Sequence, residues 1–597
     1  MGKEKLMVAV DFGTTYSGFA FCHANQKELT DIEVYSSWSG IIAPKTPTEI
    51  RYVPGRDPLW GAEAGLATER RDAANSAVIY NRFKLLLDVR GGSGIYRRSW
   101  LGSSSPSEAD NIRLPRGKSA MDVSADYLRL LYKALMGILR RRIPETLDIT
   151  PIHFIFTVPA IWGHQAQEAT KWAAKSAGFC DRNFDSLSLV SEPEAAAMYV
   201  LKAMHEANFS RNPTQAMPSL KNGDTFVVCD AGGGTVDLIS YEVEQVQPSF
   251  VLKEVVTGSG AKCGSSYIDE GFTDLLRKKI GPSFDDENIW SKKDIGRGSD
   301  LMNRFDSIKR SYGQSTNDVW YFRLPVNVPD DEENGILRNE LEFTAEELKE
   351  LFDPVVRKTI ELVKMQVANI LKCKKKVSAI FLVGGFGESP YLHQALMNWA
   401  NTLATPIPVV NPRESWSAIM RGAIVRELNP AVRSRRLRRH YGFSCDLPFD
   451  PLIHNIRQSY VSVFGGRYAH NTVEWSAHMG DICVEDKEVI FHILRELSWP
   501  RCLNERLCTT LYGAETTDAP LFTHSPGTYR LGKIYLDFSS AQFESLKSAY
   551  EDTQGNGTPV KVYEVPYQVR MRLESADIKF SVWMDGKCIG DAEISYD

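Results

Sequence analysis

The sequence predicts an α/β protein with two similar lobes around a shared cleft, followed by a mostly antiparallel β domain. Two glycine-rich turns predict the lobes: Asp11-Phe-Gly-Thr-Thr-Tyr and Asp230-Ala-Gly-Gly-Gly-Thr. Each turn follows an apolar strand that ends in aspartate, and the two lie a whole domain's length apart, which indicates duplication rather than a short repeat. Alternating apolar residues near the C-terminus predict the β domain.

The composition is that of an ordinary soluble protein with several domains. The chain has 597 residues, 43% of them hydrophobic and 24% charged, and it is too long for a single core. The formal net charge of −5 gives no general affinity for nucleic acid. Ten cysteines are scattered without a Cys-x-x-Cys pair, which favours reduced thiols over a zinc site. No signal peptide or membrane span is visible, so we expect a cytoplasmic protein, with a nuclear location also open.

Helices and strands are expected between the two turns. An apolar stripe at helical spacing predicts a helix over about Ser124 to Arg142, with Asp122 or Ser124 as its cap. The apolar run from His153 to Trp162 predicts a strand. The segment from Leu187 to Leu201 predicts a short strand and then a helix that begins near Pro193, because proline is tolerated in a first helical turn.

The character of the sequence changes after Pro430. The segment from Val432 to His440 holds five arginines and predicts an exposed linker or connecting strand. Beyond it, apolar and polar residues alternate over 577–584, and Asp585-Gly586 is a preferred pair for a two-residue hairpin turn. We therefore expect three parts: 1–430 as a two-lobed nucleotide-binding domain, 431–440 as a linker, and 441–597 as a β-rich domain.

Three glycine turns carry the chemical signal. The third, Gly384-Gly385, also follows an apolar strand. Backbone N–H groups converge in such turns and suit phosphate, whereas carboxylates suit a magnesium ion that keeps several waters. Without a cation, Asp11, Asp230 and Asp237 would repel a nucleotide. The pattern therefore predicts a magnesium-bound nucleotide, although the Rossmann and P-loop glycine motifs are absent.

These motifs together resemble one family. The sequence resembles the nucleotide-binding domain of the 70-kDa heat-shock (DnaK-like) chaperones, within the actin and hexokinase superfamily. DFGTTYS and DAGGGTVD resemble its phosphate loops, TVPAIW and SEPEAAA its connecting segments, and LVGGFGESP its adenosine loop. WSAHMGD and AEISYD resemble the divergent branch that lacks a helical lid. The resemblance implies an actin-like fold that holds ATP or ADP with Mg²⁺.

The resemblance also assigns roles to residues. Asp11 and Asp230 would hold the metal through water. Lys84 would steer the attacking water and neutralise charge on the terminal phosphate, with Glu192 and Asp237 orienting that water or the metal, and with Thr235 adding a hydroxyl group. The nucleotide contacts fall on Gly13, Thr14, Thr15, Tyr16, Gly232, Gly233, Gly234, Thr235, Lys309, Arg310, Gly384 and Gly385.

Several of these assignments have structural alternatives. Lys84 could be a surface helix lysine. Glu192 could be an acid favoured at a helix N-terminus by the helix dipole. Lys309 and Arg310 could lie on a solvated helix face.

The sequence departs from the family pattern in three places. Arg413 replaces an acid near the ribose, Gly313 replaces a serine near the adenine, and the arginine-rich segment replaces a short apolar–acidic linker. The chain after His440 is too short for both a full β-sandwich and a helical lid. Client clamping therefore does not transfer by analogy.

Two functions stay open on this basis. The first is a chaperone-like protein that binds ATP and slowly hydrolyses it to ADP and phosphate, while its β domain binds a protein client or regulator. The second is a nucleotide-sensing scaffold with little or no turnover. A small-molecule kinase would need a second-substrate aspartate motif, and none is evident. Nothing in the sequence marks the self-complementary surface of an actin-like filament.

Overall fold

The computed structural model describes most of the chain in two compact units, Met1–Ala431 and Val432–Asp597. The described residues are 5–26, 28–66, 78–88, 112–209, 220–246, 250–286, 289–290, 295–296, 298–314, 319–484, 487–498, 507–536, 546–551, 560–574, 577–592 and 594–595.

The first unit contains two sheets with the same strand order. From edge to edge the first sheet has β11 (Ser186–Ser191), β10 (Ile152–Val158), β1 (Leu6–Phe12), β2 (Tyr16–His23) and β3 (Glu33–Val34), with β6 (Thr46–Pro47) also beside β2. The second has β20 (Val409–Val410), β19 (Val377–Val383), β12 (Thr225–Ala231), β13 (Val236–Gln245) and β14 (Val251–Glu254), with β15 (Ser259–Ala261) also beside β13. In each sheet the first three strands are parallel and the next two antiparallel. This repeat confirms the predicted duplicated α/β fold.

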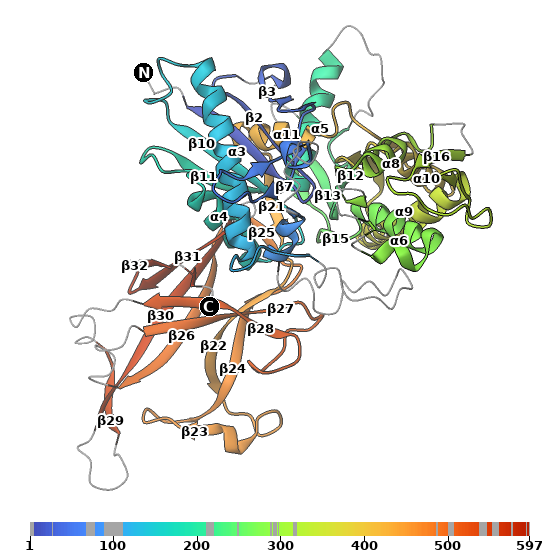
Figure 1. Cartoon of the computed structure of the whole chain (residues 1–597). Coiled ribbons are helices and arrows are strands. Elements are labelled where there is room, and N and C mark those ends of the chain that lie inside the picture. The colour runs from blue at the N-terminus through green and yellow to red at the C-terminus, as the bar shows by residue number, and fades with distance from the viewer. Residues whose placement is uncertain are drawn as a thin grey trace. The chain divides into compact units, whose positions relative to one another are not determined.

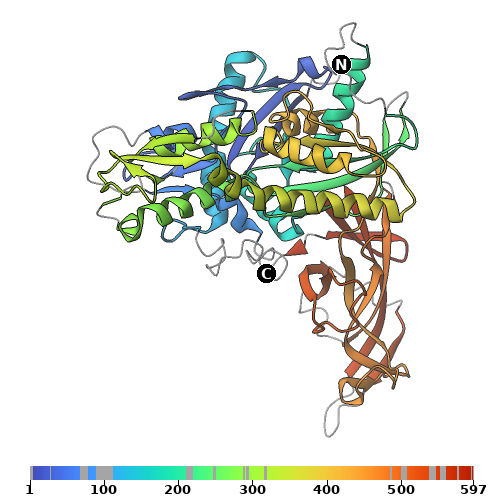
Figure 2. The ribbon, with the colours of Figure 1, turned by 90° about the vertical axis from the view of Figure 1, so that its right-hand side faces the viewer.

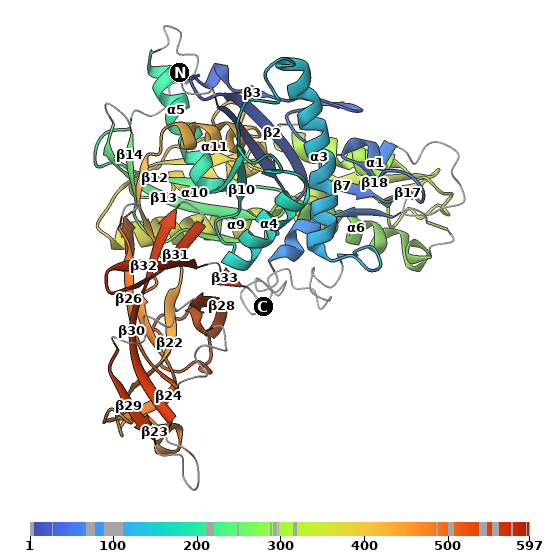
Figure 3. The same cartoon turned by 90° about the vertical axis from the view of Figure 1, so that its left-hand side faces the viewer.

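Helices cover both faces of the first sheet (Figures 1 and 3). Helix α3 (Ala120–Arg142) packs with α4 (His164–Ser176), and Tyr132 of α3 contacts Phe154 of β10 with ring centroids 6.2 Å apart. Helices α5 (Glu192–Phe209) and α11 (Ala418–Leu428) pack against each other, and α11 contacts β1, β2 and β10. Because α5 also contacts β12 and β13, these two helices connect the two sheets.

The start of α3 differs in detail from the sequence expectation. Ser119, rather than Asp122 or Ser124, is the N-cap, and its hydroxyl accepts a 3.2 Å hydrogen bond from the Asp122 N–H. The Asp122 carboxylate accepts the Ser119 N–H at 2.9 Å in return. This capping box satisfies two backbone donors and begins the helix about one turn earlier than the apolar stripe predicts.

The second lobe has its own aromatic core. Phe272 of α6 (Ser266–Ile280) stacks on Phe305 of α8 (Asp300–Ser311) with ring centroids 3.8 Å apart. Helix α9 (Ala345–Lys372), the long yellow-green helix of Figure 2, contacts α10 (Pro390–Asn401) and strands β12, β13, β15 and β19. Burial of a large apolar side chain such as Phe272 or Phe305 contributes roughly 1.5–3 kcal/mol to the free energy of folding. No helix in the described ranges is long and apolar enough to cross a bilayer.

Shorter elements complete the first unit. They are η1 (Leu29–Asp31), β4 (Ser37–Trp38), β5 (Ile41–Ile42), β7 (Glu49–Arg51), β8 (Leu59–Trp60), α1 (Ala62–Leu66), β9 (Ile79–Asn81), η2 (Phe83–Leu87), η5 (Pro282–Asp285), β16 (Val319–Arg323), β17 (Ile336–Leu337) and β18 (Glu340–Thr344).

The second unit is antiparallel β structure, as predicted. One sheet has β23 (Ser459–Val461), β24 (Arg467–Ala477), β22 (His440–Pro448), β27 (Leu507–Ala514), β28 (Thr528–Leu536) and β33 (Ile594–Ser595) in that order. The other has β26 (Val489–Ser498), β30 (Val560–Glu574), β31 (Asp577–Met584) and β32 (Lys587–Ala592), with β29 (Ser548–Glu551) also beside β30. Phe443 of β22 and Phe491 of β26 meet between the sheets with ring centroids 4.8 Å apart.

The predicted C-terminal hairpin forms between β31 and β32. Asp585 and Gly586 have positive φ angles of 47° and 75°, the backbone that a type I′ turn requires. Ile578, Phe580 and Val582 are buried, which confirms the alternation read from the sequence.

The arginine-rich segment forms a strand, the second of the two alternatives that the sequence left open, and not an exposed linker. Residues 432–436 form β21, which pairs with β25 (Ile482–Val484) inside the second unit. Leu437 is 2% exposed and joins that unit's core. Arg439 is also buried, where it donates to the Tyr529 hydroxyl at 2.9 Å and lies 3.4 Å from Glu515. These distant partners, which the local sequence cannot reveal, offset the desolvation of the guanidinium group.

Candidate functional site

The β1–β2 and β12–β13 hairpins bring their turns into contact. A Cβ atom added to Gly233 would collide with the Thr15 side chain, and one added to Gly234 would lie 2.7 Å from Thr14 Oγ1. Real Cβ atoms essentially never approach other atoms this closely. Glycine is therefore required at both positions for the two turns to pack together.

A cavity of about 220 Å³ opens where the turns meet. Every residue that the sequence assigned to metal, nucleotide or catalysis lines it except Asp237. Asp237 lies opposite Asp230 in the hairpin register and accepts a 3.2 Å hydrogen bond from the Ile161 N–H. Nine further residues, which the sequence analysis did not select, also line the cavity: Lys45, Ser265, Asp306, Phe352, Phe386, Glu388, Ser389, Trp416 and Ile419.

The second turn presents backbone donors in one direction. The carbonyl oxygens of Gly232, Gly233 and Gly234 accept hydrogen bonds of 2.9 to 3.2 Å from the N–H groups of residues 264–266. In a trans peptide the C=O and N–H groups point in opposite directions. The N–H groups of Gly233, Gly234 and Thr235 therefore point away from residues 264–266. The Gly232 N–H instead closes the turn on the Thr235 carbonyl at 2.9 Å.

The third turn lies against the end of β12. Gly384 has a φ of 86°, and a Cβ atom there would collide with the Asp230 carboxylate and the Ala231 carbonyl. That carbonyl accepts hydrogen bonds from the N–H groups of Phe386 at 2.9 Å and Gly387 at 3.1 Å. Only glycine allows this approach, which places Gly384 and Gly385 on the cavity wall beside Asp230.

Lys84 and Glu192 form a buried ion pair. Lys84 is 1% exposed, and its ammonium donates to Glu192 Oε1 at 2.9 Å. The ammonium also lies 5.0 Å from the Trp162 ring centroid. This burial excludes the alternative of a surface lysine. Glu192 is the first residue of α5, so it is both an N-terminal helix acid and a cavity residue.

Crowded carboxylates have shifted pKa values. Burial, opposed by Lys84 and reinforced by Asp11 and Asp237, raises the pKa of Glu192 to about 7. Burial, then repulsion from Glu192, Asp237 and Asp11, raises the pKa of Asp230 well above its usual value. Asp230 Oδ1 is buried and has no hydrogen-bond partner within the described ranges. The cavity therefore favours a cation near Asp230.

Lys45 places a second ammonium group in the cavity. Its Nζ lies 2.5 Å from Asp11 Oδ2, and both residues are buried. Asp11 Oδ1 also accepts a 3.2 Å hydrogen bond from the Thr157 hydroxyl. Lys45 lies outside the glycine motifs in a stretch without a recognisable pattern, so no sequence signal pointed to it.

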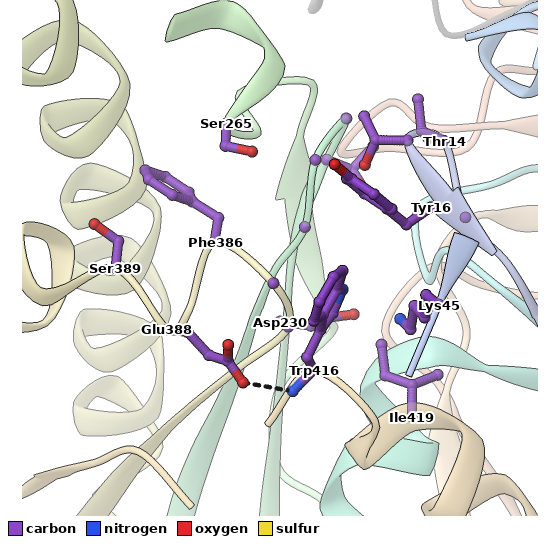
Figure 4. Close-up of a pocket in the computed structure, with 18 of the residues that line it drawn as sticks. Thr14, Tyr16, Lys45, Asp230, Ser265, Phe386, Glu388, Ser389, Trp416 and Ile419 are labelled. Carbon is purple, nitrogen blue, oxygen red and sulfur yellow. Dashed lines mark hydrogen bonds between the residues drawn. The ribbon is translucent and has the colours of Figure 1, made fainter. Parts of the chain in front are cut away.

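Aromatic side chains also line the cavity, among them Tyr16, Trp416 and Phe386 (Figure 4). The Tyr16 and Trp416 rings meet edge to face with centroids 5.3 Å apart, and the Arg310 guanidinium lies 5.0 Å from the Trp416 centroid. The backbone N–H of Trp416 donates a hydrogen bond to Glu388 Oε1 at 3.0 Å. Glu388 and Phe386 stand within the glycine motif LVGGFGESP, whereas Trp416 follows the NPRES segment without a signal of its own.

Lys309 and Arg310 lie on the C-terminal turn of α8 but differ in environment. The Lys309 ammonium is buried, 2.5 Å from Asp269 and 3.2 Å from Asp306. This excludes a solvated position for Lys309. The Arg310 side chain is 46% exposed and lies 2.7 Å from Asp306, so it lines the mouth of the cavity while it reaches solvent.

The residues present fit a hydrated divalent cation. Among the described residues, no three histidine, cysteine or carboxylate side chains converge as a ready metal cage. A magnesium ion beside Asp230 would therefore keep water ligands and add phosphate oxygens, which is its usual preference. The unpartnered Oδ1 of Asp230 and the crowded carboxylates are the features that it would satisfy.

The fold and the cleft define a protein of the actin-like ATPase class. The family model described as Hsp70 protein matches residues 131–428. The chain is therefore similar to the Hsp70 family over these residues, and its relatives include divergent Hsp70 proteins.

The sequence identity between the chain and these relatives is modest. The chain is 27% identical to heat shock 70 kDa protein 12B of Homo sapiens, over 90% of this chain and 84% of that protein. It is 26% identical to heat shock 70 kDa protein 12A of Homo sapiens, over 73% and 71%. A chaperone protein HscA homolog of Methylibium petroleiphilum is 24% identical over 69% of this chain and 57% of that protein. This similarity indicates a nucleotide-binding, chaperone-like function.

Proposed function

We propose that this chain binds Mg-ATP in the cleft between its two phosphate turns and hydrolyses it slowly, as a chaperone-like protein. The observation that carries the proposal is the convergence of both Asp-ended turns and the buried Lys84–Glu192 pair on one cavity. The N–H groups of Gly233, Gly234 and Thr235 would bind phosphate oxygens, together with the Thr14 and Thr15 hydroxyls.

The residues that line the cavity support one orientation of the nucleotide. Phosphates would lie at the glycine turns, because backbone donors and lysine ammonium groups are there. The base would lie against Trp416 and the Arg310 guanidinium, which offer stacking surfaces.

Hydrolysis would break the bond between the terminal phosphorus and its bridging oxygen, and water would add to that phosphorus. Bound magnesium would neutralise phosphate charge. Lys84 would stabilise charge that develops on the transferred group. Glu192 has a pKa near 7, so it can accept the proton of the attacking water at neutral pH. Asp237 holds the Ile161 backbone and supports the Asp230 side of the cleft.

A nucleotide-sensing scaffold with little or no turnover is the second candidate. It is favoured by the buried Lys45–Asp11 pair, which occupies a carboxylate that the hydrolytic assignment gives to the metal. One experiment separates the two functions. The nucleotide content of the full-length purified protein is measured first, and γ-phosphate release is then followed with the protein in excess over ATP.

Release of phosphate in a single exponential phase supports the proposed hydrolysis, and intact bound ATP after many hours supports the scaffold. If neither ATP nor ADP binds, both candidates are wrong.

We also propose that the second unit binds a protein client or regulator. Between its strands it holds a cavity of about 620 Å³, walled by tyrosines such as Tyr460 and Tyr468 and by the carboxylates Asp446, Glu496 and Glu564. Aromatic rings beside carboxylates suit cationic side chains. Basic peptides should therefore bind the full chain more tightly than apolar or acidic peptides in fluorescence anisotropy, and the reverse order would contradict this proposal.

A further inference from the structure

Two of the lysines that line the cleft are each paired with a carboxylate that the sequence assigned to catalysis or to the metal. Lys84 is paired with Glu192 at 2.9 Å, and Lys45 is paired with Asp11 at 2.5 Å. The second pair concerns a carboxylate that the sequence assigned to the metal. Asp11 therefore has a protein donor on each oxygen, Lys45 on Oδ2 and Thr157 on Oδ1. A magnesium-bound water would have to share or displace one of them.

The Lys45 ammonium also acts on the other predicted metal carboxylate. It opposes the burial and the neighbouring acids that raise the pKa of Asp230. Figure 4 shows the Lys45 amine turned toward the side of the cleft on which Asp230 lies. One ammonium group therefore acts on both Asp11 and Asp230. A second cation close to it would be repelled, because like charges a few ångströms apart repel strongly at low dielectric.

The chain around Lys45 is built to hold this position. Directly after it, β6 pairs with β2, so that Thr46 lies opposite Ser17. The Thr48 N–H then donates to the Thr15 carbonyl at 2.8 Å. Gly18 makes room for the lysine, because a Cβ atom at Gly18 would lie 3.0 Å from Lys45 Cγ. The ammonium is therefore preorganised at the first phosphate turn and loses little conformational entropy there.

We infer that Lys45 replaces part of the magnesium ion's charge at Asp11, so that this chain binds nucleotide with only weak dependence on Mg²⁺. The inference rests on the proposed nucleotide site. It assigns Lys45 a positioning and charge-neutralising role that neither the glycine motifs nor the family resemblance contains. Asp230, whose Oδ1 has no hydrogen-bond partner among the described residues, would hold the metal ion's remaining charge.

The test is calorimetric titration of the full chain with ADP, which avoids hydrolysis, in Mg²⁺ and in EDTA. For the wild type, removal of Mg²⁺ should weaken ADP binding by less than about tenfold. In Lys45→Gln, which frees Asp11 from its ammonium partner, the same change should weaken binding by about a hundredfold. The control is Lys202→Gln, because Lys202 forms a 2.9 Å ion pair with Glu28 outside the cavity. It should behave as the wild type.

The outcomes separate this inference from the proposed function. Absence of ADP binding under every condition overturns the nucleotide site itself. A wild-type loss of tenfold or more overturns the inference alone, as does an equal magnesium effect in the wild type and Lys45→Gln. If Lys45→Gln does not fold, the wild-type measurement still decides, since its tenfold limit needs no variant.

Discussion

The Lys84 ammonium lies 2.9 Å from the Glu192 carboxylate, although the two residues are 108 positions apart in the sequence. Both are buried, Lys84 in η2 and Glu192 at the start of α5. A buried ion pair of this kind contributes little net stability, because desolvation of the two charges offsets their attraction. Both residues line the cavity, which supports the chemical role that we propose for the pair.

Lys84→Ala should lower ATP turnover by about a hundredfold while nucleotide affinity changes less than about threefold. The reason is that its charge would act chiefly on the phosphoryl group in the transition state. Single-turnover phosphate release and ADP titration measure the two quantities separately. Equal losses of turnover and affinity would instead indicate an ordinary ground-state contact.

Asp230→Ala should remove most of the magnesium-dependent part of the stabilisation by ATP. A ligand at a hundredfold excess over its Kd stabilises the native state by about 2.7 kcal/mol, and Asp230 carries the unpartnered oxygen that a hydrated cation would use. The magnesium-dependent part is the difference between the melting temperatures measured in ATP with Mg²⁺ and in ATP without it. Asp148→Ala, which changes an exposed aspartate paired with Arg140, is the control. An unchanged magnesium shift in Asp230→Ala would refute the metal assignment.

The ligand-free protein should lose stability as pH rises from about 4.5 to about 7. The pKa of Glu192 is raised by burial to about 7, so in this window the native state keeps a proton that the unfolded state has lost. Stability therefore falls by up to about 1.4 kcal/mol per pH unit from this group. Below the window both states are protonated, and above it neither is.

Glu192→Gln should remove that contribution. The melting temperature of the variant minus that of the wild type should increase from pH 5 to pH 7. The reason is that only the wild type has a buried acid whose ionisation destabilises the folded state in this range. The first unfolding transition of the two proteins, followed in EDTA without nucleotide, measures the difference. A difference that stays constant with pH would show that Glu192 titrates at its ordinary value in the folded protein.

Apolar peptides should leave ATP turnover within about twofold, an energy near 0.4 kcal/mol. Leu437, one of the two aliphatic residues of the arginine-rich segment, is buried in the core of the second unit. Arg439 is held by Tyr529 and Glu515 in the same unit. The segment therefore has little apolar surface left for docking elsewhere. Steady-state turnover with saturating peptide, at low and high salt, tests this, and a tenfold salt-independent stimulation would contradict it.

The fold class and most of the residues that line the cleft could be predicted from the sequence. Asp11 and Asp230 occupy matching positions because each lies near the end of the first strand of a hairpin, next to its glycine turn. A hairpin is a local structure, and the residues near its turn set the register of its strands. The C-terminal hairpin at Asp585-Gly586 was predictable for the same reason.

Tertiary structure alone decided which charges neutralise one another. Lys45 reaches Asp11 only because β6 pairs with β2, and Arg439 becomes buried only because distant strands bring Tyr529 and Glu515 to it. Trp416 meets Tyr16 on the cavity wall although the two residues come from opposite ends of the first unit's sequence. Electrostatic energy depends on the distance between charges and on their burial. Neither quantity can be inferred from the local sequence.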